Sequence, residues 1–175
     1  SQEQLLAQLE KERIIGEKGE EFVISYEKKR CPFTLQQQSK IKQISVIDAS
    51  AGFDILSLDD EISQAKRYIE VKTYSGNVHF YWSSNEIEAA QLRAEKYFLY
   101  LVDYSQIEKD NYTPIIIQNP YFNVRNLSIW DIRPSSFLIS TSCSSDQLRE
   151  IIKPIQHQSI PYTLDCNEPY MMVAD

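Results

Sequence analysis

The sequence predicts an α/β domain in which a mixed β-sheet is flanked by helices and followed by an irregular C-terminal extension. The chain opens with a long helical pattern, continues with short segments of strand-like alternation, and returns to a helical pattern before its most apolar segment. The 175 residues are 42% hydrophobic and 25% charged, a balance that supports one packed domain. No glycine-rich loop joins a strand to a helix, which excludes the common phosphate-binding nucleotide folds.

Residues 2–30 are expected to be helical, because their apolar side chains recur at helical spacing in two sets. Gly16 and Gly19 lie between these sets, so the segment forms either two helices or one helix that packs closely through its glycines. The pair Cys31-Pro32 should end the helix, since the residue before a proline disfavours the helical backbone.

Short segments of strand-like pattern follow a polar loop at residues 33–40. We expect the first three to pair as antiparallel strands, with the second and third joined by an acidic turn at 59–63. The expected strands are 41–47, 53–58, 68–74 and, after a tight turn, 78–82.

The spacing of apolar residues changes from strand-like to helical at Ser83, where helix-starting residues predict a helix of about ten residues. The next segment, Tyr97–Tyr104, is nearly all apolar, which is typical of a strand covered on both faces. We assign residues 1–142 to the domain, with a core of about 13–105, and expect residues 143–175 to pack on it as a helix and tail. The weaker expected elements are strands at 113–118 and 136–140 and a capped helix at 145–153.

The charge balance argues against a protein that coats nucleic acid by bulk attraction, because 18 basic and 25 acidic residues give a net charge of −7. Residues 28–47 are the exception, since they contain no acidic side chain. This segment is either a solvated helix end and loop or a local basic groove on an acidic body. Its basic residues are Lys28, Lys29, Arg30, Lys40 and Lys42.

Compartment signals predict a cytoplasmic protein with no membrane partner. The longest run that resembles a membrane span is Tyr97–Val102, whereas a spanning helix needs about 20 residues. The three cysteines are widely separated and lack paired metal-ligand spacing, so we interpret them as free thiols in a reducing compartment.

Three charged residues interrupt the apolar strand pattern. Glu70 and Lys72 should share one face of their strand, and Asp54 in the preceding strand comes close to Glu70 if the two strands pair. Two adjacent carboxylates repel unless one is protonated or a cation lies between them, and Mg²⁺ prefers such oxygen ligands. On spacing alone, Glu70 and Lys72 could equally be a solvent-facing ion pair, and Asp54 could serve the turn before it.

Five blocks in order resemble the domain family named after the C-terminal region of the plant NO VEIN protein. That family is similar to the PD-(D/E)XK, or restriction-endonuclease-like, superfamily, and the resemblance covers about residues 13–105. The blocks are Gly16-x-x-Gly19-Glu20-x-x-Val23, Gly52-Phe53-Asp54-Ile55, Ile69-Glu70-Val71-Lys72-Thr73, Phe80-x-x-Ser83-x-Asn85-Glu86 and Tyr97-x-Leu99-Tyr100-x-Val102.

The resemblance implies a catalytic site. Asp54 and Glu70 match the residues that bind Mg²⁺ or Mn²⁺, Lys72 matches the motif lysine, and Glu20 matches the glutamate of the first helix. Helical periodicity alone does not choose between Glu20 and its neighbour Glu21. The fourth block contains three further polar residues, which either bind substrate or cap the helix; they are Ser83, Asn85 and Glu86.

The resemblance further implies a Mg²⁺-dependent endonuclease that hydrolyses DNA phosphodiester bonds, as part of a restriction or anti-phage defence system. DNA would lie along the basic residues of segment 28–47, further domains or a partner protein are expected, and double-strand cleavage would favour a homodimer. The alternative is a catalytically silent module with the same fold that recognises protein or nucleic acid within a larger protein. The net charge favours the module, and the intact set of Asp54, Glu70 and Lys72 favours the enzyme.

Overall fold

A computed structural model describes residues 1–63, 65–126 and 130–133 of the chain. Its described elements belong to one compact unit, Ser1–Ile132. The expected strand at 136–140, helix at 145–153 and C-terminal tail lie outside the described residues. In chain order the elements are α1 (Gln2–Arg30), α2 (Leu35–Gln38), β1 (Lys42–Gln43), β2 (Ile55–Leu58), β3 (Lys66–Tyr74), α3 (Ser84–Arg93), the 3₁₀ helix η1 (Ala94–Lys96), β4 (Tyr97–Asp103), β5 (Ile115–Gln118) and α4 (Pro120–Asn126).

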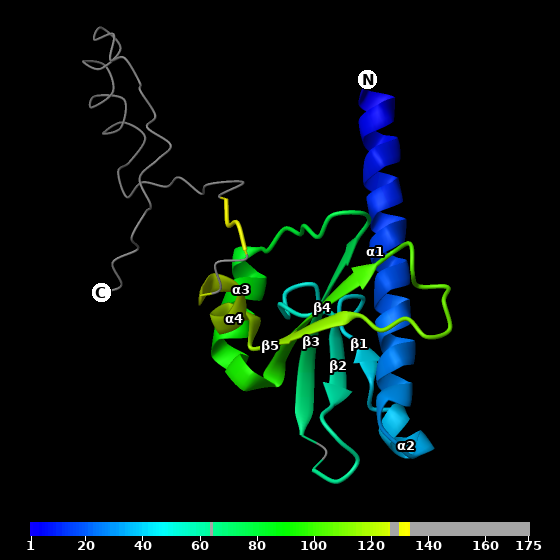
Figure 1. The fold of residues 1–175 in the computed structure, drawn as a ribbon, viewed down its shortest axis with the longest axis vertical. Helices are drawn as coiled ribbons and strands as arrows, with labels where there is room; N and C mark the ends of the chain where they lie inside the picture. Colours follow the sequence, from blue (N-terminus) through cyan, green and yellow to red (C-terminus); the bar gives the residue numbers. More distant parts are fainter. Residues whose placement is uncertain (64, 127–129, 134–175) are drawn as a thin grey trace, which may run out of the picture. The chain divides into compact units, whose positions relative to one another are not determined.

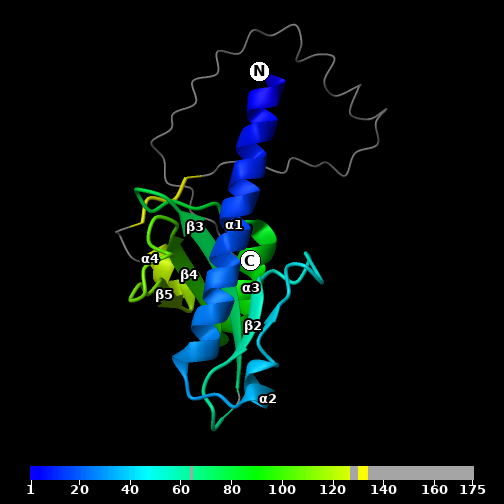
Figure 2. The ribbon, with the colours of Figure 1, turned by 90° about the vertical axis from the view of Figure 1, so that its right-hand side faces the viewer.

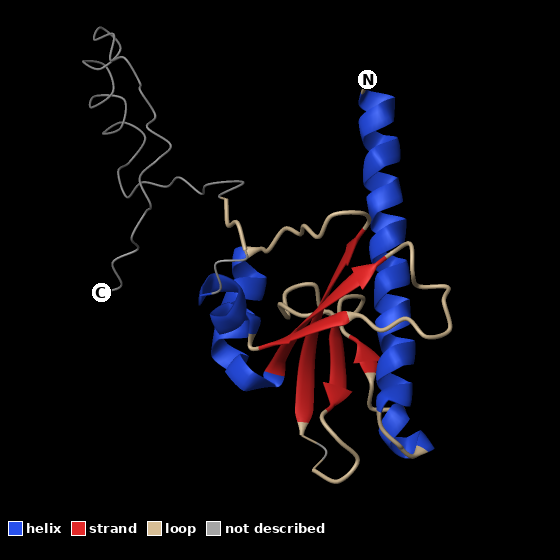
Figure 3. Cartoon of the chain, viewed as in Figure 1, coloured by secondary structure: helices blue, strands red, loops and turns tan. Residues whose placement is uncertain are grey.

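The strands form one mixed sheet in the order β1-β2-β3-β4-β5 (Figure 3). β1, β2 and β3 pair antiparallel, β3 and β4 pair parallel, and β4 and β5 pair antiparallel. The parallel pair is joined through α3, as a parallel connection requires a crossover. The prediction of an α/β domain with helices on both sides of a mixed sheet is therefore confirmed.

Helix α1 crosses one face of the sheet, and α3 and α4 lie against the other (Figures 1 and 2). On the α1 face, Val23 packs against buried side chains of β2, β3 and β4, including Ile55, Ile69 and Val102. On the opposite face, Ala90 of α3 packs with Tyr97. Strand β4 is buried on both faces, which explains its almost uninterrupted apolar sequence.

Residues 2–30 form a single helix, so the question of one helix or two is settled. Gly19 makes this packing possible, because a Cβ atom at its position would lie 1.9 Å from the side-chain oxygen of Thr73 in β3. Gly16 has open space around it. The close approach of α1 to β3 at Gly19 therefore sets where the neighbouring Glu20 can reach.

The expected strand at 41–47 is wrong in length, since only Lys42–Gln43 pairs with β2. The carbonyl oxygen of Asp54 accepts hydrogen bonds from the backbone N–H groups of both Ile44 and Ser45, at 2.6 and 3.2 Å. The chain then turns, and Val46 and Ile47 are each 72% exposed. The apolar residues that suggested a strand continue into an exposed turn instead.

The expected strand at 78–82 does not form. Both edges of β3 are already paired, one with β2 and the other with β4, so a hairpin partner after the Gly76 turn has no free edge to join. The segment instead packs aromatic side chains against Leu99 and Leu101 of β4, with Phe80 between Trp82 and Trp130 at ring distances of 6.4 and 5.8 Å. The structure also adds two helices that the sequence pattern did not predict, α2 and α4.

A buried polar network connects α1 with the sheet within the core of the α1 face. Glu27 is fully buried, and its carboxylate accepts hydrogen bonds from Ser57 at 2.7 Å, Arg30 at 3.0 Å and the Tyr100 hydroxyl. Arg67 lies 3.8 Å from Glu27 and donates to the Tyr100 hydroxyl at 3.0 Å. These partners satisfy a carboxylate that would otherwise be costly to bury.

Candidate active site

Asp54 lies directly before β2, where the pairing of β2 with β3 ends. Its backbone N–H donates to the carbonyl of Ile69 at 2.9 Å, and its side-chain Oδ2 accepts a hydrogen bond from the backbone N–H of Val71 at 2.8 Å. Since Ile55 is opposite Ile69 in the sheet register, Asp54 adjoins Glu70. The structure thus brings together the two carboxylates that the sequence pattern singled out.

Lys72 lies between two carboxylates. Its Nζ is 2.7 Å from Glu70 Oε1 and 2.8 Å from Glu86 Oε2. Glu70 is only 3% exposed, so its charge depends on the few groups around it. Glu70 and Lys72 form an ion pair, as one sequence interpretation had it, but the pair is buried within the sheet and does not face solvent.

The electrostatics of this cluster favour a bound cation or proton. Burial and the nearby negative charge of Glu20 raise the pKa of Asp54 to about 7, although the Val71 N–H and Lys72 act against that rise. Burial and the charge of Asp54 raise the pKa of Glu70 well above its ordinary value. Burial lowers the pKa of Lys72, but Glu70 and Glu86 together raise it further, so its net pKa is raised and the amine stays protonated.

Glu20 is the glutamate of α1 that reaches this region. It is partly buried, whereas Glu21 is exposed, and its Oε2 accepts hydrogen bonds from Gln43 Nε2 at 2.8 Å and Ser45 Oγ at 2.6 Å. The structure therefore distinguishes two residues that helical periodicity alone left equivalent. Gln43 and Ser45 were not identified in the sequence, because nothing local in the chain links them to a glutamate more than 20 residues away.

Ser83 and Asn85 support the site from α3. Ser83 caps the helix, since its Oγ accepts a hydrogen bond from the Glu86 N–H at 3.3 Å while the Glu86 carboxylate accepts from the Ser83 N–H at 3.1 Å. Asn85 donates its side-chain amide to the carbonyl of Ser50 at 3.1 Å, which ties α3 to the loop before Asp54. The capping interpretation of Ser83 is therefore the one that the geometry favours.

For Glu86 the sequence left substrate binding and helix capping open, and the structure shows capping together with an ion pair. Glu86 belongs to the same block as Ser83, and its capping position points the carboxylate towards Lys72. A glutamate three residues after a cap residue is an ordinary helix signal. Nothing local in the sequence indicated that it would share a lysine with Glu70.

The loop that carries Asp54 depends on Gly52. Its φ of +72° is a left-handed conformation, and a Cβ atom there would lie 2.7 Å from Ala89 and 2.8 Å from the carbonyl oxygen of Asn85. The Tyr97 hydroxyl also donates to the Gly52 carbonyl at 2.7 Å. Glycine is thus required for the loop to approach α3 and place Asp54 at the start of β2.

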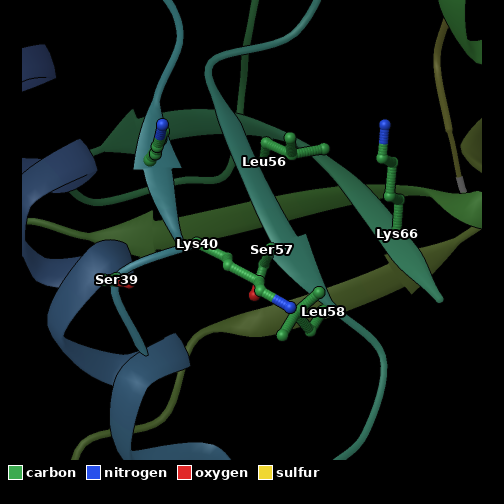
Figure 4. A pocket seen from close by; sticks show the side chains of 7 residues that line it. Ser39, Lys40, Leu56, Ser57, Leu58 and Lys66 are labelled. Atoms are coloured by element: carbon green, nitrogen blue, oxygen red, sulfur yellow. The ribbon is translucent and has the colours of Figure 1, made fainter. Parts of the chain in front are cut away.

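The basic residues of segment 28–47 lie in separate places. Lys28 and Lys29 belong to the last turn of α1, about 13 Å along the helix axis from Glu20. The Arg30 guanidinium donates to the carbonyls of Leu58 and Asp59 at 2.6 and 2.9 Å, so it stabilises the end of β2. Lys40 and Lys42 line a pocket beside β2 (Figure 4).

The chemistry of the donor set fits a hard divalent cation. Asp54 and Glu70 supply carboxylate oxygens whose pKa values are raised by burial and by neighbouring carboxylates, Glu20 for Asp54 and Asp54 for Glu70, and a cation would relieve that repulsion. Among the residues that the structure describes, no group of three or more His, Cys, Asp or Glu side chains is arranged to enclose a metal ion. A coordination shell of two carboxylates completed by water molecules is a common arrangement for Mg²⁺.

No helix in the described part of the chain is both long and apolar enough to cross a membrane. No curated protein and no solved structure matches the chain. A family model described as "Protein NO VEIN, C-terminal" matches residues 19–117, which include Glu20, Asp54, Glu70, Lys72 and Glu86. The match covers more than half of the 175 residues, so the chain belongs to the NO VEIN C-terminal family.

Proposed function

We propose that this domain is a Mg²⁺-dependent nuclease of the PD-(D/E)XK superfamily that hydrolyses DNA phosphodiester bonds. The observation that carries the proposal is the pairing of the partly buried Asp54 with the buried Glu70, with Lys72 two residues after Glu70 in β3. Carboxylates whose pKa values are raised by burial and by neighbouring carboxylates cluster at functional sites more often than elsewhere. The mixed sheet with helices on both faces is compatible with this superfamily.

Asp54 and Glu70 would hold the metal ion, with Mn²⁺ as a substitute. When bound, the ion supplies Lewis-acid stabilisation of the phosphate and lowers the pKa of a water molecule. The Val71 N–H holds the Asp54 carboxylate in place at 2.8 Å, so one oxygen of that carboxylate is already oriented. Preorganised ligands of this kind reduce the cost of binding a cation.

Lys72 would act as a fixed positive charge. Its raised pKa keeps the amine protonated at neutral pH, which suits charge stabilisation on a phosphate better than proton abstraction. Glu86 holds the same amine at 2.8 Å, so Lys72 keeps a partner when Glu70 turns towards a cation. Glu20, held by Gln43 and Ser45, would complete the outer shell of the site.

The biological setting follows from the superfamily. We propose DNA as the substrate, a cytoplasmic restriction or anti-phage defence system as the context, and a further domain or partner protein as the source of specificity. Cleavage of both strands in one encounter would favour a homodimer, since the proposed site contains one pair of metal-binding carboxylates.

The second candidate function is a silent recognition module with the same fold. It is favoured by two observations: Lys72 already pairs with Glu70 Oε1, and the described residues hold no group of three His, Cys, Asp or Glu side chains around a common centre. In such a module the Glu70, Lys72 and Glu86 cluster would serve only to join β3 to α3. The two functions differ in whether Glu70 exchanges Lys72 for a metal ion.

Calorimetric titration of Mg²⁺ and Mn²⁺ into the wild type, Glu70→Ala and Glu88→Gln tests the choice. Glu88 is an exposed residue of α3 and provides a matched control. The nuclease proposal expects metal binding by the wild type and the control, loss of binding in Glu70→Ala, and metal-dependent nicking of plasmid DNA. Absence of metal binding in the wild type would contradict it and favour the silent module.

A further inference from the structure

The face of the sheet that carries Glu70 also carries lysines. In β3, Arg67, Ile69 and Val71 face α1, because Arg67 contacts Glu27 and the other two belong to the core beneath that helix. Strand alternation places Lys66 and Glu70 on the opposite face. Lys66 is exposed on this face, whereas Glu70 is buried, and α3 packs over the strand position between them through Tyr68.

β1 and β2 extend the same face. Gln43 contacts Glu20 of α1, so Lys42 beside it points the other way, and it is directly opposite Leu56 in the register. A pocket of about 460 Å³ lies here, and Figure 4 shows Lys66 extending its amine away from β3 near Leu56 of the adjacent strand. We refer to Lys42, Leu56 and Lys66 as the lysine face.

The lysine face lacks acidic partners. Within the described residues, the side chains of Lys42 and Lys66 form no ion pair or hydrogen bond. In the nearby β2–β3 turn, Asp59 pairs with Arg67 at 2.9 Å and Asp60 accepts hydrogen bonds within its own turn at 2.5–2.7 Å, and the third acidic residue, Glu61, forms no ion pair with either lysine. Two lysines without partners on a chain of net charge −7 therefore form a local positive surface.

We propose that the lysine face binds the phosphate backbone of the DNA strand that enters the Asp54–Glu70 site, an inference that rests on the proposed nuclease function. Lys66 is four residues from Glu70 on the same face of β3, which corresponds to about 13 Å. A DNA strand advances about 3.4 Å per nucleotide along the helix axis, so Lys66 would meet phosphates about four nucleotides from the cleaved bond. Leu56, between the lysines, offers apolar contact to the sugars.

This assignment differs from a basic groove along the whole of segment 28–47. It uses Lys42, adds Lys66 from outside that segment, and leaves Lys28 and Lys29 at the far end of α1 without a role in DNA binding. The two pairs of lysines have the same charge, so they provide a matched comparison. Only position relative to the Asp54–Glu70 site distinguishes them.

The test measures DNA binding by the full chain in EDTA, where cleavage does not occur. Fluorescence anisotropy with labelled single-stranded and double-stranded oligonucleotides of one sequence would compare the wild type, Lys42→Glu/Lys66→Glu and Lys28→Glu/Lys29→Glu. We expect the first double variant to lose at least tenfold in affinity, and Lys42→Gln/Lys66→Gln to reduce the salt slope by about two. The Lys28/Lys29 variant should bind within about twofold of the wild type, and thermal melting should show all variants folded.

Equal losses in both double variants, or no loss in either, would overturn the assignment, as would a wild type that binds no DNA in EDTA. The result also separates this inference from the proposed function. Lysine-dependent binding by a protein that never cleaves DNA would support the lysine face and count against the nuclease. Metal-dependent cleavage that is unaffected by Lys42→Glu/Lys66→Glu would support the nuclease and reject the lysine face.

Discussion

Lys72 and Glu86 form an ion pair, Nζ to Oε2 at 2.8 Å, that joins the central region of the sheet to the first turn of α3. The same Glu86 carboxylate accepts the N–H of Ser83, so the cap of the helix and the charge cluster are built from one side chain. A substitution that disturbs the helix cap therefore also disturbs the charge cluster, and the reverse holds as well. This relationship explains why residues of the helix start belong to the site although they are not expected to touch the metal.

The stability of the metal-free protein should fall as the pH rises from about 4 to about 7. The Asp54 carboxyl has its pKa raised from 3.8 to about 7, so between these values the folded state binds more protons than the unfolded chain. The stabilising protonated form is present at low pH and is lost as the pH approaches 7. We expect this group to contribute a decrease of about 3 kcal/mol, measurable by urea denaturation in EDTA across that range.

Asp54→Asn should flatten this pH dependence and raise the stability at pH 8, because the amide removes the repulsion with Glu70 and Glu20. Asp110→Asn, at an exposed position, serves as the control and should leave the pH profile unchanged. If Asp54→Asn instead unfolds the protein, the aspartate is needed for the fold and the electrostatic account of the site is wrong.

Glu86→Gln should weaken metal binding by roughly tenfold, because Lys72 loses one of its two carboxylates and interacts more strongly with Glu70. The glutamine can still accept the Ser83 N–H, so the helix cap is retained. Calorimetric titration of Mn²⁺ measures the effect, and Glu88→Gln on the same helix is the matched control. Unchanged metal affinity in Glu86→Gln would show that Lys72 and the metal do not compete for Glu70.

Gly19→Ala should destabilise the protein by about 1–3 kcal/mol, because the new methyl group would collide with the side chain of Thr73. Gly16→Ala, where nothing lies within 4 Å, should stabilise the helix by roughly 0.5–1 kcal/mol. Urea denaturation of both variants and of Gly19→Ala/Thr73→Ala gives the measurement. The double variant should recover part of the loss, and equal effects of the two glycine substitutions would contradict the close packing of α1 on β3.

Glu27→Ala should cost about 3–5 kcal/mol of stability, since it removes the buried acceptor of Ser57 and Tyr100 and leaves Arg67 with only Asp59 as a carboxylate partner. The exposed Glu21→Ala should change stability by less than about 0.5 kcal/mol. Thermal melting compares the two. Metal affinity should be the same in both variants, because Glu27 lies in a network separate from the Asp54–Glu70 site, and a loss of metal binding in a folded Glu27→Ala protein would count against that separation.

Most of the architecture could be predicted from local patterns. The helix at 2–30, the strand around Glu70 and the apolar strand β4 have strong periodicity, and the structure confirms them. The failures at 41–47 and 78–82 share one cause: alternation indicates that a segment can be a strand, but whether it is one depends on a free edge to pair with. Beside β3 no edge was free, because β4 already pairs with it. Beside β2 the strand pairing of β1 ends where the Asp54 carbonyl accepts the next two backbone N–H groups.

By itself, the sequence determined the residue types of the candidate site and the order of its blocks, because Asp54, Glu70 and Lys72 stand out within apolar strand patterns. Only the tertiary structure decided which glutamate of α1 reaches the site, and which residue shares Lys72 with Glu70. The same holds for the lysines, since only strand pairing shows that Lys42 and Lys66 occupy one face. The physical reason is that charge and hydrogen-bond interactions act over a few ångströms in space, and separation along the chain does not report that distance.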